Sequence, residues 1–459
     1  MPSSAGLARL VGDDLMVPCI DGQERPYLSL DAAASTPALP EVAEAVSEFL
    51  PWYSSVHRGA GWKSQLATAA YEEAREAALR FAGRSGRDDI AILCRNTTEA
   101  INHLAYRLRL DRSDVVLTTV VEHHANLLPW ARVAERRYVE VGGDGVFSLE
   151  DVTAAMDEKP APKLLAITGA SNVTGWTPPI PGIIAAAHER GIPVLVDAAQ
   201  LAPHRPLPPD ADYVAWSGHK MYAPFGASVL IGPRSSFTSG DPFLAGGGAV
   251  DLVDLDEVVW TDPPEREEAG SPNLLGAVAL HRAMDSLTEI GWPAITGHDS
   301  DLAARLRSGL GQIEGIRLLG VSATDLPVAT FVVAGVPHSL VAARLSAEYG
   351  IGVRHGCFCA HPYLTRLLQL SDTEVEAYRT AVLHGDRSRM PGAVRASAGL
   401  STSTADIDRF LEGVKVIAGG GPSPTSYTQD PHTGDYWPET GDERWATAAR
   451  RLGASCARG

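Results

Sequence analysis

The chain has few cysteines, and it lacks the common cysteine and histidine motifs of zinc sites. The cysteines among its 459 residues are Cys19, Cys94, Cys357, Cys359 and Cys456. A small and odd number of cysteines in so long a chain argues against a disulfide framework and predicts a reducing, cytoplasmic environment. Neither a CxxC nor an HExxH motif occurs, so we expect no metal site.

Basic residues and long apolar runs are also scarce. Lys and Arg number 39 against 56 Asp and Glu, for a net charge of -17, which excludes broad binding to nucleic acid or to an anionic membrane surface. No apolar run approaches the roughly 18 residues of a membrane-spanning helix. The start of the chain lacks the apolar core of a signal peptide. We therefore expect a soluble protein with room for two or three domains.

Short apolar runs alternate with helical patterns between about residues 60 and 285. Helical spacing is clear over 98–108 and 181–191. The predicted strands are 90–95, 114–120, 164–169, 194–199, 213–218 and 227–232. Because fully apolar strands need cover on both faces, this pattern predicts a mostly parallel sheet between helices.

The pattern changes after residue 284. Helical stretches at 300–313 and 338–349 bracket a strand at 328–335, and another strand is expected at 392–399. These features predict a smaller α+β domain. The Gly- and Pro-rich stretch that follows is typical of a linker or poorly ordered tail, although Trp437 and Trp445 are unusual in a pure linker and leave docking of the tail as an alternative. The expected divisions are an N-terminal arm 1–25, a large domain 26–285, a small domain 286–416 and a tail 417–459.

A lysine and an aspartate stand at the ends of two different strands of the predicted sheet. Lys220 follows the strand in "YVAWSGHK", and Asp197 closes the strand in "VLVDAAQ". Ligands of open parallel sheets bind beyond the carboxyl ends of the strands, where both residues would emerge. A lysine that forms a Schiff base and a carboxylate that pairs with a pyridinium nitrogen are what pyridoxal 5'-phosphate (PLP) requires. A surface lysine or a buried ion pair is the simpler alternative.

Other strand ends offer a phosphate cradle and a flat ring. Thr97 and Thr98 stand where a strand turns into a helix, and helix N-terminal amides with hydroxyls bind phosphate. His123 and His124 follow another strand, and an imidazole can stack on the cofactor ring and relay protons. Taken singly, these residues are as well explained as a helix cap and surface histidines.

Several motifs, in this order, give the chain its family resemblance. They are "SVHRGAGWKSQ", "CRNTTEAIN", "VEHHANLLPW", "VLVDAAQ", "SGHKMYAPFGA", "GVRHGCFCAHP" and "VRASAG". Over about residues 26–415 the chain resembles group II cysteine desulfurases, which belong to the class V aminotransferase family. The resemblance implies PLP fold type I, an α/β architecture in which a large domain with a mostly parallel seven-stranded-type sheet carries a smaller α+β C-terminal domain. It also implies a PLP cofactor, a homodimer, a small amino-acid substrate and a sulfur-acceptor protein.

The resemblance also implies roles for single residues. Lys220 would form the Schiff base, Asp197 would pair with the pyridinium and His123 would stack on the ring. The implied cofactor-binding set is Thr97, Thr98, His123, Asp197, Gln200, Ser217, His219 and Lys220. The implied substrate-binding set is Asn172, Arg354 and Arg395. The residues implied to reach the partner subunit's site are His57, Arg58 and Ser271.

The loop "GCFCAHP" indicates sulfur chemistry. By the resemblance, Cys359 is the nucleophile whose thiolate takes the substrate sulfur, leaving alanine and an enzyme persulfide. Cys357 stands where that branch often has His, and "GCFC" resembles the desulfurase-like domain of molybdenum cofactor sulfurases. In an extended segment both thiols would face one side, with Cα atoms roughly 6.5–7 Å apart, so a disulfide would be strained.

We therefore expect a cysteine desulfurase or related C–S lyase acting on L-cysteine or a related thio- or seleno-amino acid. Alternatives are another class V PLP enzyme (an aminotransferase, an epimerase or a β-lyase of secondary metabolism) and a sulfur donor like the molybdenum cofactor sulfurases. A non-catalytic scaffold is a further alternative, against which Lys220, Asp197 and Arg395 argue, because a scaffold needs none of them.

Overall fold

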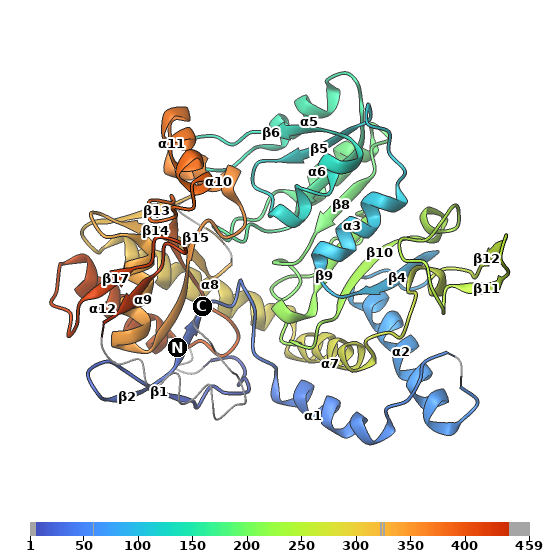
Figure 1. The fold of residues 1–459 in the computed structure, drawn as a ribbon, viewed down its shortest axis with the longest axis horizontal. Helices are drawn as coiled ribbons and strands as arrows, with labels where there is room; N and C mark the ends of the chain where they lie inside the picture. Colours follow the sequence, from blue (N-terminus) through green and yellow to red (C-terminus); the bar gives the residue numbers. More distant parts are fainter. Residues whose placement is uncertain (1–5, 58, 322–323, 325, 440–459) are drawn as a thin grey trace.

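Two α/β bodies lie side by side in the computed structural model, which describes residues 6–57, 59–321, 324 and 326–439 (Figure 1). A large sheet organises one body. A smaller sheet, to which both an N-terminal and several C-terminal strands contribute, organises the other. None of the helices in the described ranges combines the length and apolarity needed to cross a bilayer.

The large sheet has seven strands, all parallel except β10, which runs antiparallel to both of its neighbours. In sheet order they are β4 (Asp89–Cys94), β10 (Ser228–Pro233), β9 (Tyr213–Ser217), β8 (Val194–Asp197), β7 (Pro162–Thr168), β5 (Val115–Thr119) and β6 (Glu135–Val139). The mostly parallel sheet expected from the sequence is confirmed, and each predicted strand lies within two residues of its place.

Alternating side chains of these strands fill two separate cores. Leu164 and Leu195 face one core with α3 (Thr97–Arg107), whereas Leu165 and Val196 face the other. The helices that cover the second face are α1 (Pro40–Phe49), α2 (Trp62–Phe81), α5 (Leu149–Asp157), α6 (Ile180–His188) and α7 (Leu274–Ile290). Because both faces are covered, every strand position can be apolar.

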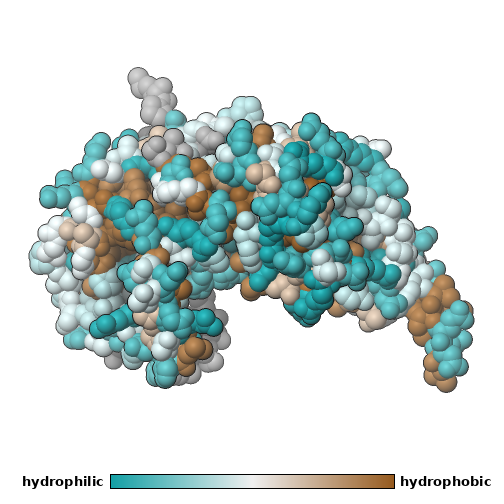
Figure 2. Space-filling view, turned by 90° about the horizontal axis from the view of Figure 1, so that it is seen from above, coloured by the Kyte–Doolittle hydropathy of each residue, from teal (hydrophilic) through white to brown (hydrophobic). Residues whose placement is uncertain are grey.

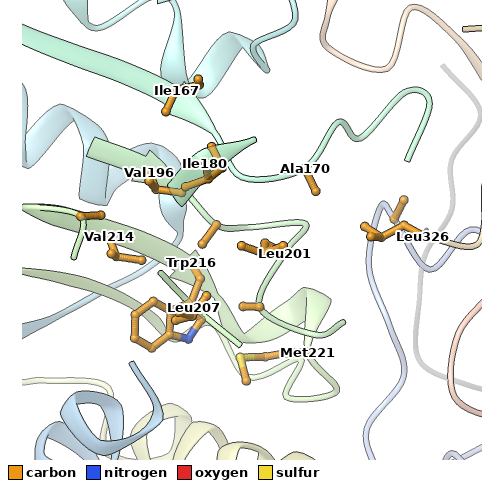
Figure 3. Close-up of a cluster of buried hydrophobic side chains, with 14 of the residues drawn as sticks. Ile167, Ala170, Ile180, Val196, Leu201, Leu207, Val214, Trp216, Met221 and Leu326 are labelled. Carbon is orange, nitrogen blue, oxygen red and sulfur yellow. The ribbon is translucent and has the colours of Figure 1, made fainter. Parts of the chain in front are cut away.

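The second of these cores continues into the smaller body. Figure 3 shows Val196, Val214 and Trp216 packed near Leu201, with Leu326 approaching from across the boundary. Trp216 is completely buried and is among the largest side chains of this core. The continuous apolar packing holds the carboxyl ends of the large-sheet strands against the second body, which is where a site is expected.

The smaller sheet has five strands. In order they are β13 (Ile316–Leu319), β14 (Val328–Val333), β16 (Ala393–Ser397), β15 (Ile351–Gly356) and β3 (Leu28–Leu30). The helices packed on it are α8 (Trp292–Gly311), α9 (His338–Tyr349) and α12 (Thr404–Ala418). Strand β3 pairs in parallel with β15, so residues 28–30 lie in this sheet although we predicted the large domain to begin at residue 26. Leu28 and Leu30 gain burial there that a surface arm would lack.

The other α-helices and β-strands of the described residues lie outside these two sheets and their main covering helices. They are β1 (Met16–Pro18), β2 (Glu24–Pro26), α4 (Trp130–Val133), β11 (Val250–Val253), β12 (Val258–Trp260), α10 (His361–Leu368), α11 (Asp372–Leu383), β17 (Tyr427–Gln429) and β18 (Tyr436–Pro438).

The predicted tail is partly a docked hairpin rather than a linker. Strands β17 and β18 pair, the Tyr427 hydroxyl donates to Glu348 (3.1 Å), and the Arg387 guanidinium donates to the His432 carbonyl (3.0 Å). The low apolar content of this stretch predicted disorder, but polar contacts rather than apolar burial fasten it. Residues 440–459, with Trp445, lie outside the described residues.

Candidate active site

A cavity of about 190 Å³ lies at the carboxyl ends of the large-sheet strands, facing the second body. Its lining includes every residue that the sequence predicted to hold cofactor or substrate within one chain. These are Thr97, Thr98, His123, Asn172, Asp197, Gln200, Ser217, His219, Lys220, Arg354 and Arg395, and Cys359 joins them. The fold therefore brings together residues spread over some 300 positions of sequence.

Lys220 and Asp197 both face this cavity from neighbouring strands. Asp197 ends β8, and Lys220 closes a single 3-10 turn directly after β9. Burial lowers the pKa of Lys220 to about 8 and raises the pKa of Asp197. Within the described ranges no ion pair joins them within 4 Å, and the one hydrogen bond to the Asp197 carboxylate comes from the Ala199 amide (3.0 Å). A simple buried ion pair therefore does not explain them.

The start of α3 and the end of β9 form one polar corner of the cavity. The Thr97 amide donates to Ser217 Oγ (2.8 Å), and the two hydroxyls are hydrogen-bonded (2.6 Å). Thr98 lies on the same first turn, and His219 follows Ser217 across the corner. Burial lowers the pKa of His219 to about 4. Amides at the start of an 11-residue helix, with hydroxyls beside them, match a phosphate group.

His123 carries a defined tautomer. Its Nδ1 accepts a hydrogen bond from the Ala125 amide (3.0 Å), so the ring proton is on Nε2. Burial lowers the pKa of His123 to about 3, which keeps the ring neutral at physiological pH. His124, by contrast, does not line the cavity and stacks on His361 with ring centroids 5.1 Å apart and ring planes 1° apart. The structure therefore favours His123 as the residue that faces a cofactor ring.

A buried arginine with a spare donor faces the cavity from the smaller sheet. Arg395 is 2% exposed; its Nη1 donates to the Asn172 carbonyl (2.9 Å) and its Nη2 to Asp31 (2.9 Å). Its buried Nε has no partner within the described residues. Arg354 is its cross-strand neighbour and also lies near Asp31 (3.7 Å). This geometry rules out a surface salt bridge for Arg395 and places a charged guanidinium, the group that best matches a carboxylate, in the cavity wall.

The two predicted amide side chains hold the cavity walls. Gln200 Nε2 donates to the Ala33 carbonyl (2.6 Å), and Asn172 Nδ2 donates to the Phe358 carbonyl (2.7 Å). Asn172 thus links the cysteine loop to Arg395: its side-chain amide donates to the loop, and its backbone carbonyl accepts from the arginine.

The cysteine loop is a tight turn, so the extended geometry that we predicted is wrong. The Ala360 amide donates to the Cys357 carbonyl (3.0 Å), and Phe358 and Cys359 have left-handed φ values of 55° and 54°. Side chains with a Cβ adopt that region only at a cost of about 1–2 kcal/mol. The turn is held by the Asn172 bond, by a bond from the His124 amide to the Cys359 carbonyl (2.8 Å), and by Phe358 under the Arg395 guanidinium (5.1 Å).

The turn separates the two cysteines. Cys359 is exposed and lines the cavity, whereas Cys357 is half-buried and does not. Burial raises the pKa of the Cys357 thiol. The structure therefore places Cys359, as the resemblance implied, beside the other site residues.

Asp31 and Glu122 were missed by the sequence reasoning. Asp31 bridges both arginines, and the only signal for it is an acidic residue directly after the apolar strand "LSL". Glu122 is completely buried and accepts hydrogen bonds from Thr119 (2.8 Å), Asn126 (2.7 Å) and the Thr168 amide (2.9 Å). Burial raises the pKa of Glu122 to about 8. By tying β5 to β7, it fixes the strand end that carries His123.

The residues predicted to serve the partner subunit lie elsewhere. His57 and Ser271 line a separate hollow of about 520 Å³, and Arg58 lies outside the described residues. His57, Glu72 and Glu265 bring potential metal-ligand atoms within 4.8 Å of one another. The Arg75 guanidinium already pairs with both carboxylates (2.8 and 3.2 Å), so these acidic groups have a cation partner without a metal.

Comparisons with known proteins show the family of this chain. The aminotransferase class-V family model matches residues 28–410. A probable cysteine desulfurase of Halalkalibacterium halodurans is 37% identical over 352 residues, covering 74% of this chain and 85% of the relative. A cysteine desulfurase of Haloferax volcanii is 32% identical over 386 residues, covering 81% and 90%.

Solved structures give the same result. A cysteine desulfurase of Thermococcus onnurineus NA1 superposes with a TM-score of 0.76 and the Escherichia coli cysteine desulfurase CsdA with 0.72. Each is 30% identical to this chain, and each alignment covers 86% of this chain and 95% of the solved chain. The fold type expected from the sequence is thus confirmed, and the chain belongs to the class V aminotransferase family.

Proposed function

We propose that this protein is a PLP-dependent cysteine desulfurase. The observation that carries the proposal is that a thiol, Cys359, lines the same small cavity as Lys220, Asp197 and Arg395. The family is PLP-dependent, and the relatives with 32–37% identity are named cysteine desulfurases or probable ones. An aminotransferase or epimerase has no use for a thiol at this position.

The cavity fits the cofactor. Asp197 presents a buried carboxylate with one backbone hydrogen bond, which suits a pyridinium N–H. Lys220 would hold the cofactor covalently, and the α3 start with Thr97, Thr98 and Ser217 would hold its phosphate. The bound cofactor supplies an electron sink that stabilises negative charge on the substrate carbons and so permits C–S cleavage.

The chain's own residues supply binding, proton transfer and the sulfur acceptor. Arg395, which lines the cavity, would orient the substrate carboxylate through its guanidinium. An amine with a pKa of about 8, such as Lys220, can take and return a proton near neutral pH. Cys359 Sγ would form an S–S bond to the substrate sulfur as the C–S bond breaks. A proton replaces sulfur on carbon, so the products are alanine and a Cys359 persulfide, and no oxidant is needed.

We further propose that the protein acts as a cytoplasmic homodimer. His57 and Ser271, which the family resemblance assigns to a neighbour's site, line a hollow separate from the active-site cavity of their own chain, and this supports a role across a subunit boundary. The β11–β12 hairpin also projects from the body with exposed apolar side chains, as the brown tip of Figure 2 shows, and Leu255 at its end is fully exposed. Contiguous exposed apolar surface of this kind supports a subunit contact. The free thiols support a reducing compartment.

A product assay tests the proposed activity. Purified holoprotein with L-cysteine and a reducing thiol should release alanine and sulfide in equal amounts without a keto acid. Lys220→Ala should release neither. Alanine formation that depends on an added keto acid acceptor, or unchanged turnover by Cys359→Ala, would instead indicate an aminotransferase or a lyase that needs no thiol.

A further inference from the structure

A second, larger cavity adjoins the active site. It measures about 580 Å³ and lies between the start of α9, the end of β15, the segment 387–392 and the C-terminal hairpin. We call it the outer cavity. Arg354, Phe358 and Cys359 line both this cavity and the active-site cavity. Cys359 can therefore take sulfur on one side and deliver it on the other.

The charge of the outer cavity is mainly positive. Arg354, Arg387 and Arg389 line it, and among the described residues Asp435 is its only acidic lining residue. Asp435 pairs with His355 (3.3 Å), which also lines the cavity. A group bearing a negative charge would therefore be attracted into this space, although the protein as a whole is strongly acidic.

The C-terminal hairpin helps to wall this cavity. Thr433, Gly434 and Asp435 supply part of its lining, and they lie beyond the residues matched by the family model, which ends at 410. The hairpin is fastened by the Arg387 bond to the His432 carbonyl and by Gln429 Nε2, which donates to the Ser388 carbonyl (2.9 Å). The volume of the outer cavity is within the range of about 300–1,000 Å³ typical of small-molecule sites.

We propose that the outer cavity binds a small thiol carrying a negatively charged group, and that this thiol accepts the sulfur from Cys359. The inference rests on the proposed desulfurase function. The acceptor thiolate forms an S–S bond with the outer sulfur of the persulfide, and the bond from that sulfur to Cys359 Sγ breaks. Cys359 returns as a thiolate and the acceptor leaves as a persulfide, so atoms and electrons balance without a further reagent.

Cys357 does not compete with such an acceptor. Cys357 lines the outer cavity but not the active-site cavity, and burial raises the pKa of its thiol. A protonated thiol attacks a persulfide slowly, because the thiolate is the nucleophile. Burial of Cys357 thus disfavours transfer of the sulfur from Cys359 to Cys357.

The test compares three thiols in which two methylene groups separate the sulfur from an anionic, a neutral or a cationic group: 3-mercaptopropionate, 2-mercaptoethanol and cysteamine. Holoprotein is first loaded with L-cysteine, and mass spectrometry measures the added sulfur on the Cys359 peptide. The rate of sulfur loss is then measured for each thiol, and it is divided by the thiolate concentration and by the rate at which the same thiolate reacts with a free cysteine persulfide, because thiolates of higher pKa are intrinsically more nucleophilic. We expect the anionic thiol to react fastest and the cationic thiol slowest. The ratio of these two rates, which we call the spread, should be about tenfold and should shrink at high salt.

Two substitutions should move this spread in opposite directions. Arg389→Gln should reduce it about twofold to fourfold, and Asp435→Asn should increase it. Arg379→Gln, an exposed arginine of α11 that does not line the cavity, is the matched control and should leave it unchanged.

Two failures are distinguishable. If Cys359 acquires no sulfur from L-cysteine, the proposed function fails and this inference fails with it. If Cys359 is loaded but the three thiols react equally, or Arg389→Gln leaves the spread unchanged, the desulfurase proposal stands and the small anionic acceptor is refuted in favour of a protein acceptor.

Discussion

Replacing Arg395 by lysine tests how the site recognises its substrate. Lysine keeps the charge beside Asp31, but its three N–H donors all lie on one atom, so it cannot span Asn172 and Asp31 as the two terminal nitrogens of Arg395 do and also direct a donor at a carboxylate. A hydrogen bond to a charged group contributes about 1.5–3 kcal/mol. At about 1.4 kcal/mol per factor of ten, kcat/KM for L-cysteine should fall roughly 10- to 150-fold.

The measurement is alanine formation over a range of L-cysteine concentrations, with cofactor content determined on the same samples. The cofactor content should be unchanged, because Arg395 lies on the smaller sheet and away from the phosphate corner at α3. Arg354→Lys should cost less, since its side chain is 56% exposed and water screens its charge. Arg305→Lys, in an exposed pair with Asp408, is the control. Wild-type kcat/KM in Arg395→Lys at full cofactor content would refute this account of substrate binding.

Three further predictions concern the lysine, the cysteines and the dimer. Burial lowers the pKa of Lys220 to about 8, and only the neutral amine is a nucleophile. The rate of PLP incorporation into apoprotein should therefore rise with pH and level off above about pH 8. A rate that still rises steeply beyond pH 10 would contradict this prediction. Cys359→Ala should bind PLP normally yet acquire no persulfide, while Cys357→Ala should retain turnover and a persulfide on Cys359; the reverse pattern by mass spectrometry would assign the nucleophile to Cys357. Mixing Lys220→Ala chains with His57→Ala chains, each inactive alone, should restore part of the activity if sites are shared between subunits, and heterodimers without activity would argue against sharing.

Much of the fold and most of the site were predictable from local patterns. Apolar runs of strand length alternating with helical spacing predict a covered parallel sheet, because each strand and helix must bury its own apolar face. Polar residues that directly follow such strands, among them Asp197, Lys220 and His123, necessarily gather at one edge of that sheet. Their identity and order along the chain also carried the family resemblance, which comparison confirmed over residues 28–410.

Only the tertiary structure decided which polar groups meet across the two bodies. Asp31 joins Arg354 and Arg395 because β3 pairs with β15, a contact between segments more than 300 residues apart that no local pattern signals. The cysteine loop looked extended, yet the Asn172 amide and the His124 backbone hold it in a left-handed turn that exposes Cys359 and half-buries Cys357. The polar tail looked disordered, yet it docks through hydrogen bonds with Glu348 and Arg387. In each case a long-range contact outweighs a local preference of only about 1 kcal/mol per residue, so the sequence determines the elements and their chemistry while the packed fold determines which of them act together.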